Sequence, residues 1–222
     1  MASATIPLEY PPLRFAASDA DPRARRIVEA AYELLDEAGL EGLTIRAVLA
    51  RTGLARRAFY DNFTGKDDLM LAVFEQTIRE AARHYRMMIE TLPSPMARLG
   101  MIVTSIGLGA ADLEGGGVTV AHRRNAAMSR EHLRLAESHP DELQTALAPL
   151  RALFVEQLQA GIAAGEMRTG DAELQALLIY NMVSTTAHTE LMAAEKEAPD
   201  REWRIRLANA VWEFCRNAIA IE

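Results

Sequence analysis

Cysteine is almost missing from this chain, because its 222 residues include only Cys215. A single cysteine excludes an intramolecular disulfide framework and is typical of proteins in a reducing cytoplasm. Long hydrophobic runs are missing too. The longest stretch without Asp, Glu, Lys or Arg, 174–189, has 16 residues, and the next longest, 99–111, has 13, whereas a helix needs about 18 or more apolar residues to cross a bilayer. The first fifteen residues lack the charged start and apolar core of a secretory signal. We therefore expect a cytoplasmic protein that has no membrane partner.

Signatures of catalysis are also missing. The sequence has no Ser/His/Asp arrangement and no glycine-rich phosphate loop, and its 5 histidines lack the close spacing of metal ligands. We expect no enzyme activity, no catalytic residue, no metal ion and no cofactor.

Positive charge is scarce in the chain as a whole, with 24 basic and 31 acidic residues for a net charge of −7. Its distribution is uneven, because residues 1–66 are neutral overall and the deficit lies in residues 67–222. Between residues 44 and 66, Asp61 is the one acidic residue, against five basic residues: Arg46, Arg51, Arg56, Arg57 and Lys66. Such a local patch attracts a phosphate backbone at short range, since more distant charge is screened within about 8–10 Å. A solvated basic helix face is the alternative.

Helical periodicity follows the chain from residue 21 onward, and no segment alternates with period two. The pattern predicts an all-α fold of about nine helices and no sheet. Asp21, Thr44 and Asp171 are expected N-caps, and Gly39 is expected to end the first helix. Pro149 should kink or divide the helix that contains it. The predicted helices cover 22–38, 44–52, 55–62, 66–92, 96–113, 119–138, 141–164, 171–194 and 200–219.

Residues 44–63, TIRAVLARTGLARRAFYDNF, predict two short helices joined by a tight turn at Gly53. Phe59 and Phe63 are four residues apart and therefore share a buried face, which leaves Arg56, Arg57 and Tyr60 outward. This is the layout of a helix-turn-helix, whose second helix enters the major groove of DNA.

A longer stretch, RIVEAAYELLDEAGLEGLTIRAVLARTGLARRAFYDNFTGKDDLML at residues 26–71, resembles the TetR-type (TetR/AcrR) transcriptional regulators. The resemblance rests on Leu43-Thr44, Gly53-Leu54, Phe59-Tyr60, Phe63 and the Gly65–Leu69 start of the fourth helix. It implies a flexible arm at 1–20, a helix-turn-helix DNA-binding domain at 21–66, and a helical effector-binding and dimerisation domain at 67–222.

The resemblance also implies contacts to double-stranded DNA. Thr44, Tyr60, Asn62 and Lys66 would contact phosphates, and positions 55–58 would approach base edges. Two positions depart from the family pattern. Ala55 stands where a Ser or Thr usually caps the recognition helix, and Arg57 replaces a small residue. Whether Arg57 contacts a base or a phosphate stays open, and an idle surface pair is the alternative for Arg56 and Arg57. The expected DNA-binding residues are Thr44, Arg46, Ala55, Arg56, Arg57, Tyr60, Asn62 and Lys66.

The last two predicted helices carry apolar residues at three- and four-residue spacing, and in the family such helices form a four-helix bundle across a twofold axis. We therefore expect a homodimer, which lets two recognition helices contact successive major grooves of a palindrome about 34–36 Å apart. The alternative is an intramolecular core, and Cys215 is expected to be a small core residue. The expected interface residues are Leu177, Thr185, Trp203, Leu207, Ala210, Val211 and Phe214.

The resemblance further implies a cavity for a small-molecule effector of unknown identity, enclosed by the fourth to eighth helices. Methionine-rich walls suit flexible apolar ligands, although each of these residues is also compatible with a plain core position. The expected lining residues are Met88, Met101, Ser105, His122, Met128, Phe154, Gln157 and Asn181.

These features predict a ligand-responsive, dimeric repressor that a small hydrophobic or amphipathic effector releases from a palindromic operator. An activator or co-regulator with no effector is the alternative with the same DNA contact. A helical adaptor that does not bind DNA is a further one.

Overall fold

The computed structural model describes residues 21–108, 120–194 and 201–221, and side chains of residues 120–127 and 193–194 are not described. Over these ranges the chain forms nine helices and no strand, which confirms the predicted all-α fold. The helices are α1 (Pro22–Gly42), α2 (Ile45–Thr52), α3 (Arg56–Tyr60), α4 (Lys66–Ile89), α5 (Pro95–Leu108), α7 (Val120–Ser138), α8 (Pro140–Ala163), α9 (Ala172–Ala194) and α10 (Arg201–Ile219).

The helices begin where the sequence supplies capping side chains. The Asp21 carboxylate accepts from the Arg23 amide at 2.8 Å, and Thr44 Oγ1 accepts from the Ala47 amide at 3.1 Å. Asp171 accepts from the amides of Glu173 and Leu174. Each of these bonds satisfies an amide that has no partner inside its helix. The predicted caps at all three positions are therefore confirmed.

Two helix breakers have different outcomes. Gly39 has φ 64 and ψ −162, so regular helix stops there, as predicted, before one further turn to Gly42. Pro149 was predicted to kink or divide its helix, but α8 is one helix from Pro140 to Ala163. Buried residues on both sides of Pro149, including Leu147 and Leu150, hold α8 against its neighbours. Their packing offsets the backbone hydrogen bond that proline removes.

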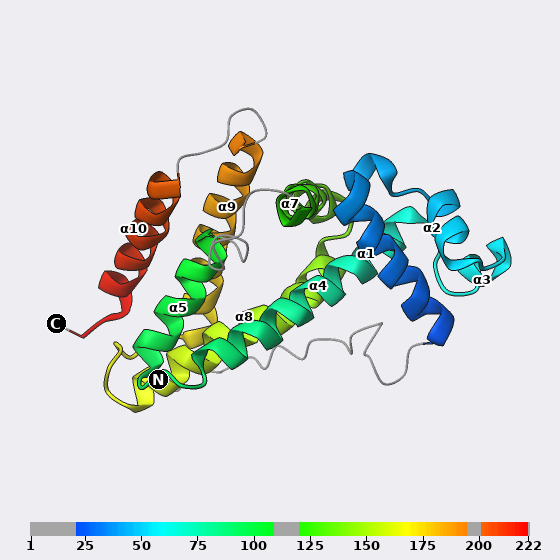
Figure 1. The fold of residues 1–222 in the computed structure, drawn as a ribbon. Coiled ribbons are helices and arrows are strands. Elements are labelled where there is room, and N and C mark those ends of the chain that lie inside the picture. Colours follow the sequence, from blue (N-terminus) through cyan, green and yellow to red (C-terminus); the bar gives the residue numbers. More distant parts are fainter. Residues whose placement is uncertain (1–20, 109–119, 195–200, 222) are drawn as a thin grey trace.

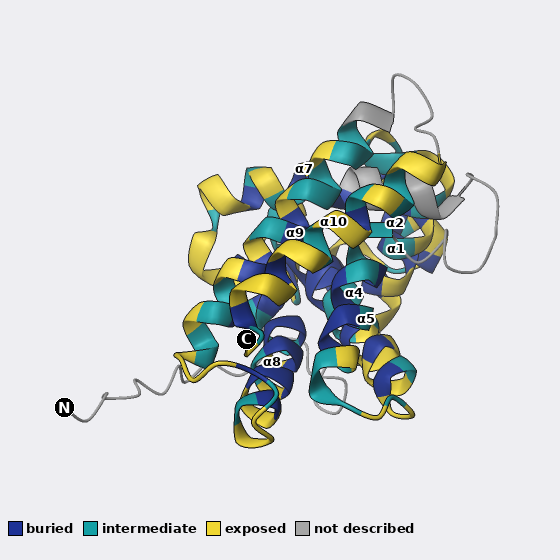
Figure 2. Cartoon of the chain, turned by 90° about the vertical axis from the view of Figure 1, so that its left-hand side faces the viewer, coloured by how far each residue is buried: buried dark blue, intermediate teal, exposed yellow. Residues whose placement is uncertain are grey.

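The helices are arranged in two groups that share one hydrophobic core. Helices α1, α2 and α3 lie at one end of the molecule, and α5, α9 and α10 lie at the other (Figure 1). Helix α4 leaves the first group and packs along α8, while α7 contacts both α1 and α9. Figure 2 shows buried positions on α4, α5 and α8 facing inward, with exposed positions on the outer surfaces. The core therefore continues from α1 to the second group without interruption.

Helices α5 and α10 approach each other closely because glycines of α5 face α10. A Cβ atom at Gly100 would lie 2.8 Å from Trp212 Cε2, and one at Gly107 would lie 3.1 Å from the Ala208 Cβ. Cys215 is buried on α10, in agreement with its predicted core role.

In the described part of the chain, no helix is long and apolar enough to cross a membrane.

Candidate nucleic-acid interface and internal cavity

The turn between α2 and α3 places α3 on the surface. Gly53 adopts φ 67, and its amide donates to the Leu49 carbonyl at 2.9 Å. This left-handed conformation is one that a side chain rarely tolerates. Phe59 and Phe63 are buried, with ring centroids 5.4 Å apart. Their burial turns the opposite side of α3 toward solvent.

The outward side of α3 presents a paired arginine and tyrosine. The Arg56 guanidinium lies 5.4 Å from the Tyr60 ring centroid, and its Nη2 donates to the Tyr60 hydroxyl at 3.2 Å. Arg57 is almost unburied, with 92% of its side chain exposed and a 3.9 Å contact to Asp61. The two arginines therefore differ, since Arg56 is held in place by Tyr60 and Arg57 is nearly free to reorient.

Helix α3 is shorter than predicted, with five residues from Arg56 to Tyr60 instead of a helix over 55–62. Ala55 is its N-cap and makes no side-chain capping bond, as expected for this residue. Asn62 lies past its end and donates from Nδ2 to the Ala58 carbonyl at 2.9 Å. The Asn62 amide therefore closes the last turn of α3 in the DNA-free protein.

The eight residues predicted to contact DNA all lie between Thr44, the N-cap of α2, and Lys66, the first residue of α4. Seven are exposed and Asn62 is half-buried. The structure brings these residues together on one small head, formed by α1, α2, α3 and the start of α4.

Arg51 corrects the predicted basic patch. It was counted with the cations available to phosphate, but its guanidinium binds two carboxylates of α1. Its Nη1 lies 2.9 Å from Glu37 Oε1 and 3.1 Å from Glu33 Oε2. The hydrogen bond from Arg51 lowers the pKa of Glu37. Arg51 thus joins α2 to α1. Sequence spacing could not reveal these partners because they lie on another helix.

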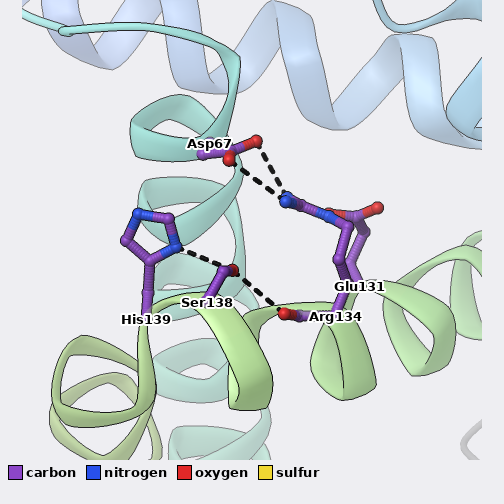
Figure 3. Close-up of polar contacts among 5 residues, drawn as sticks. All are labelled: Asp67, Glu131, Arg134, Ser138 and His139. Carbon is purple, nitrogen blue, oxygen red and sulfur yellow. Dashed lines mark hydrogen bonds and ion pairs between the residues drawn. The ribbon is translucent and has the colours of Figure 1, made fainter.

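A polar network joins the first turn of α4 to α7 (Figure 3). The Arg134 guanidinium donates to both Asp67 carboxylate oxygens, at 2.9 and 3.1 Å. It also donates to Glu131 Oε2 at 2.7 Å. Asp67 follows Lys66 directly, in the first turn of α4. The α7–α4 network, as we call Asp67, Glu131 and Arg134, therefore ties α7 to the helix that leaves the head.

A cavity of about 430 Å³ lies between α1, α4, α5, α7, α8 and α9. Its size is within the usual range of small-molecule sites. Apolar residues form most of its wall, among them Phe74, Ile78, Ile106, Met128, Leu150 and Leu191. The tyrosines Tyr32, Tyr85 and Tyr180 also line it. The polar residues of the wall are Thr77, Glu80, His84, Ser129, His132, Ser184 and His188.

Of the eight predicted ligand contacts, only Met128 lies on the wall of this cavity. Ser105 and Phe154 are fully buried in the core, and Gln157 lines a second cavity beside Arg86. Met88 and Met101 are half-buried against the core, and Asn181 is exposed. His122 lies in the part of α7 with no described side chains. The seven other than Met128 stay predictions, and the six of them with described side chains lie outside the wall of this cavity.

Sequence reasoning missed His132 and His188 of the cavity wall because it considered these two histidines only as metal ligands. Their spacing held a signal. His132 follows Met128 by four residues and His188 follows Ser184 by four, so each pair shares one face of its helix. Among the described residues, no group of three or more His, Cys, Asp or Glu side chains is placed to hold a metal ion.

Burial shifts the titration of the cavity groups toward their uncharged forms. It lowers the pKa of His132, and burial together with the nearby His132 lowers the pKa of His188 to about 4. Burial raises the pKa of Tyr85 to about 12 and also raises the pKa of Tyr180. At neutral pH these four side chains are therefore uncharged.

Helices α9 and α10 carry apolar side chains that the single chain leaves exposed. Phe214 is 65% exposed, Leu178 is 59% exposed and Trp203 is 47% exposed. Of the residues predicted for a dimer interface, Thr185, Trp203, Ala210 and Phe214 are exposed, and Leu177, Leu207 and Val211 are half-buried. The opposite face of α10 packs on α5, so this helix has one intramolecular face and one that is unpartnered within the protomer.

The head and the whole fold both match known proteins. Residues 27–73 match the model of the family described as "Bacterial regulatory proteins, tetR family". The chain is 21% identical over 199 residues to the fatty acid metabolism regulator protein of Bacillus subtilis (strain 168), covering 89% of this chain and 96% of that protein.

Two solved structures share the fold along most of their length. The transcriptional regulator FadR from Bacillus subtilis, in complex with stearoyl-CoA, matches with a TM-score of 0.65 and 19% identity, over 86% of this chain and 96% of that one. A transcriptional regulator from Saccharomonospora viridis, in complex with choline, matches with a TM-score of 0.63 and 16% identity, over 90% and 98% of the two chains. The family match in the head, carried on this shared fold, confirms that the chain resembles the tetR family of bacterial regulatory proteins.

Proposed function

We propose that this protein is a ligand-responsive transcriptional repressor that binds a palindromic operator as a homodimer in the cytoplasm. Residues 21–66 form its DNA-binding domain, and residues 67–222 bind the effector and the second subunit. One observation carries the proposal: Phe59 is buried and Tyr60 holds Arg56 outward, on a helix that follows a tight turn. A short helix fixed in this way presents its side chains to a major groove.

The side chains on the head match the chemistry of DNA. An arginine pairs with the O6 and N7 atoms of guanine, and a good bidentate pair discriminates by about 1–3 kcal/mol. Arg56 is the candidate for this contact because Tyr60 orients it. Phosphate oxygens can accept hydrogen bonds from Lys66, from Thr44 and from the exposed guanidinium of Arg57. The patch remains positive after Arg51 is removed from it, since Arg46, Arg56, Arg57 and Lys66 face one acidic residue, Asp61.

The exposed apolar face of α9 and α10 supports the homodimer. Large side chains such as Leu178 and Phe214 are costly to leave in water when they gather on one surface. A second copy of the chain buries them and places two heads on one DNA duplex.

Two helices, α4 and α7, connect the cavity to the head, and through them ligand binding can change DNA binding. Helix α7 contributes Met128 and His132 to the cavity wall and Arg134 to the α7–α4 network. Helix α4 lines the same cavity and begins at the head. A ligand that binds one arrangement of α7 and α4 more tightly shifts the population toward that arrangement. The two heads then no longer match the groove spacing.

The relatives leave the chemical class of the effector open. One similar structure holds stearoyl-CoA, an anionic thioester, and another holds choline, a cation. Because the two regulators share this fold, the fold does not determine the class of ligand, and the side chains of the cavity decide it.

The test is binding of the purified protein to the DNA upstream of its own gene in a gel-shift assay at fixed salt. We expect a shifted palindrome, and loss of the shift for Arg56→Ala and for Tyr60→Ala. The matched control is Arg83→Ala, which removes an exposed arginine of α4. Normal binding by folded Arg56→Ala and Tyr60→Ala proteins contradicts the assigned interface, and circular dichroism establishes that both are folded.

A further inference from the structure

Two histidines from different helices form a polar end of the cavity. The rings of His132 in α7 and His188 in α9 have centroids 4.7 Å apart. His132 also contacts the Phe74 ring, at a centroid distance of 5.7 Å. His188 Nδ1 lies 2.8 Å from Ser129 Oγ. Both rings are therefore held in place before any ligand arrives.

Each of these rings keeps one buried nitrogen without a hydrogen-bond partner. His132 Nδ1 and His188 Nε2 are both inaccessible to solvent and unpaired within the described structure. Most buried polar atoms in proteins are hydrogen-bonded, and one left unpaired costs about 1–3 kcal/mol. Two such atoms, on neighbouring rings of residues that line one cavity, indicate that a bound molecule completes them.

The hydrogen-bonding pattern of the pair suits an oxygen atom of an uncharged group. A neutral histidine offers one donor and one acceptor. If Ser129 donates to His188 Nδ1, then Nε2 carries the hydrogen and is a donor, and in the other tautomer it is an acceptor. A ligand hydroxyl satisfies either tautomer, and a carbonyl satisfies the donating one.

The charges around the cavity disfavour an anion. The described residues that line it include no lysine or arginine, and Glu80 is their one carboxylate. A carboxylate or phosphate entering this apolar space would therefore have no opposite charge to offset its loss of hydration. A quaternary ammonium group has no hydrogen to donate and no lone pair to accept with, so it would leave both buried nitrogens unpaired.

We propose that the effector is an uncharged, largely apolar molecule with a hydroxyl or carbonyl group, and that His132 and His188 bind that group. The inference rests on the proposed function only in calling this molecule an effector. The aliphatic and aromatic wall holds the rest of the molecule, and the histidine pair fixes its orientation.

The test compares three probes with the same ten-carbon chain: 1-decanol, decanoate and decyltrimethylammonium. Isothermal titration calorimetry on the full chain at pH 7.5 is expected to give an affinity for 1-decanol at least about tenfold above the other two. His132→Phe and His188→Phe keep a ring of similar size and should each weaken 1-decanol binding by about five- to thirtyfold. His84→Phe is the matched control, because His84 lines the same cavity but is not one of the two paired histidines.

Three results overturn the inference: tighter binding of either ion, no binding of 1-decanol, or equal 1-decanol affinity in all four proteins. If His188→Phe does not fold, His188→Leu replaces it, with thermal melting as the check on folding. Gel shifts with operator DNA separate this inference from the proposed function. Operator binding combined with a failed calorimetric result leaves a DNA-binding repressor with a different ligand. Failure of the ligand-free chain to bind any operator overturns the repressor function but not the calorimetry.

Discussion

In the head, Phe59 and Phe63 are four residues apart in the sequence and pack against each other. In the cavity, Ser129 and His188 are in contact although 59 positions separate them in the sequence. The head is therefore specified by short-range spacing: a cap at Thr44, a turn at Gly53 and an apolar pair four residues apart. The cavity wall requires six helices to be in place before its polar groups converge. A local pattern can be recognised in a sequence, while a wall assembled from distant helices cannot.

The largest expected effect comes from removing the core of the head. Phe59→Ala should lower the free energy of unfolding by about 3–5 kcal/mol, since Phe59 is fully buried. Urea unfolding followed by circular dichroism measures this loss. Phe214→Ala is the matched control, because that ring is 65% exposed in the protomer. It should instead weaken subunit association in sedimentation velocity. Equal destabilisation by the two variants would erase the distinction between a head core and a dimer surface.

A single phosphate contact should have a smaller effect on DNA binding alone. Lys66→Gln removes the exposed cation at the start of α4 and should weaken binding roughly fivefold for every DNA sequence. The slope of log affinity against log salt should fall by about one. Fluorescence anisotropy across a salt series measures both quantities. A loss of affinity confined to the operator would show that Lys66 contacts a base, and no loss would remove it from the interface.

The link between the two regions predicts a smaller effect still. Arg134→Gln breaks the α7–α4 network and should change the ligand-induced loss of operator affinity by about threefold. Stability should fall as well, by about 1–3 kcal/mol, because the substitution leaves the buried Glu131 carboxylate without its guanidinium partner. Arg86→Gln is the control, since it breaks an ion pair of similar exposure between α4 and α8, Arg86 to Glu156. If both variants change the ligand response equally, the network has no special part in coupling.

The last effect is a pH dependence that belongs to the cavity. A histidine in an unfolded chain has a pKa of about 6.5, and burial lowers the pKa of His188 to about 4. Between these values the unfolded chain binds a proton that the folded chain excludes, so the free energy of unfolding should fall as pH drops from 6.5 toward 4. Above pH 6.5 this contribution is constant. His188→Phe should flatten the curve in this window, and an unchanged curve would contradict the buried neutral ring.

Particular residues show where sequence reasoning ended. The helix caps, the turn at Gly53 and the burial of Phe59 followed from local rules and were predicted. The partner of Arg51 on α1, the packing of α10 on the glycines of α5, and the continuity of α8 through Pro149 depend on neighbouring helices. The cavity prediction favoured methionines by residue type, although position decides, and only Met128 faces the space that His132 and His188 line.

The most direct measurement is the affinity of the intact protein for its operator palindrome and for unrelated DNA of equal length, alongside Arg56→Ala, at one salt concentration. The account predicts that the unmodified protein prefers the operator by at least a thousandfold. Arg56→Ala should lose about tenfold or more of that preference while its affinity for unrelated DNA changes little. Equal affinity of the unmodified protein for the two DNAs, or an unchanged preference in Arg56→Ala, would contradict it.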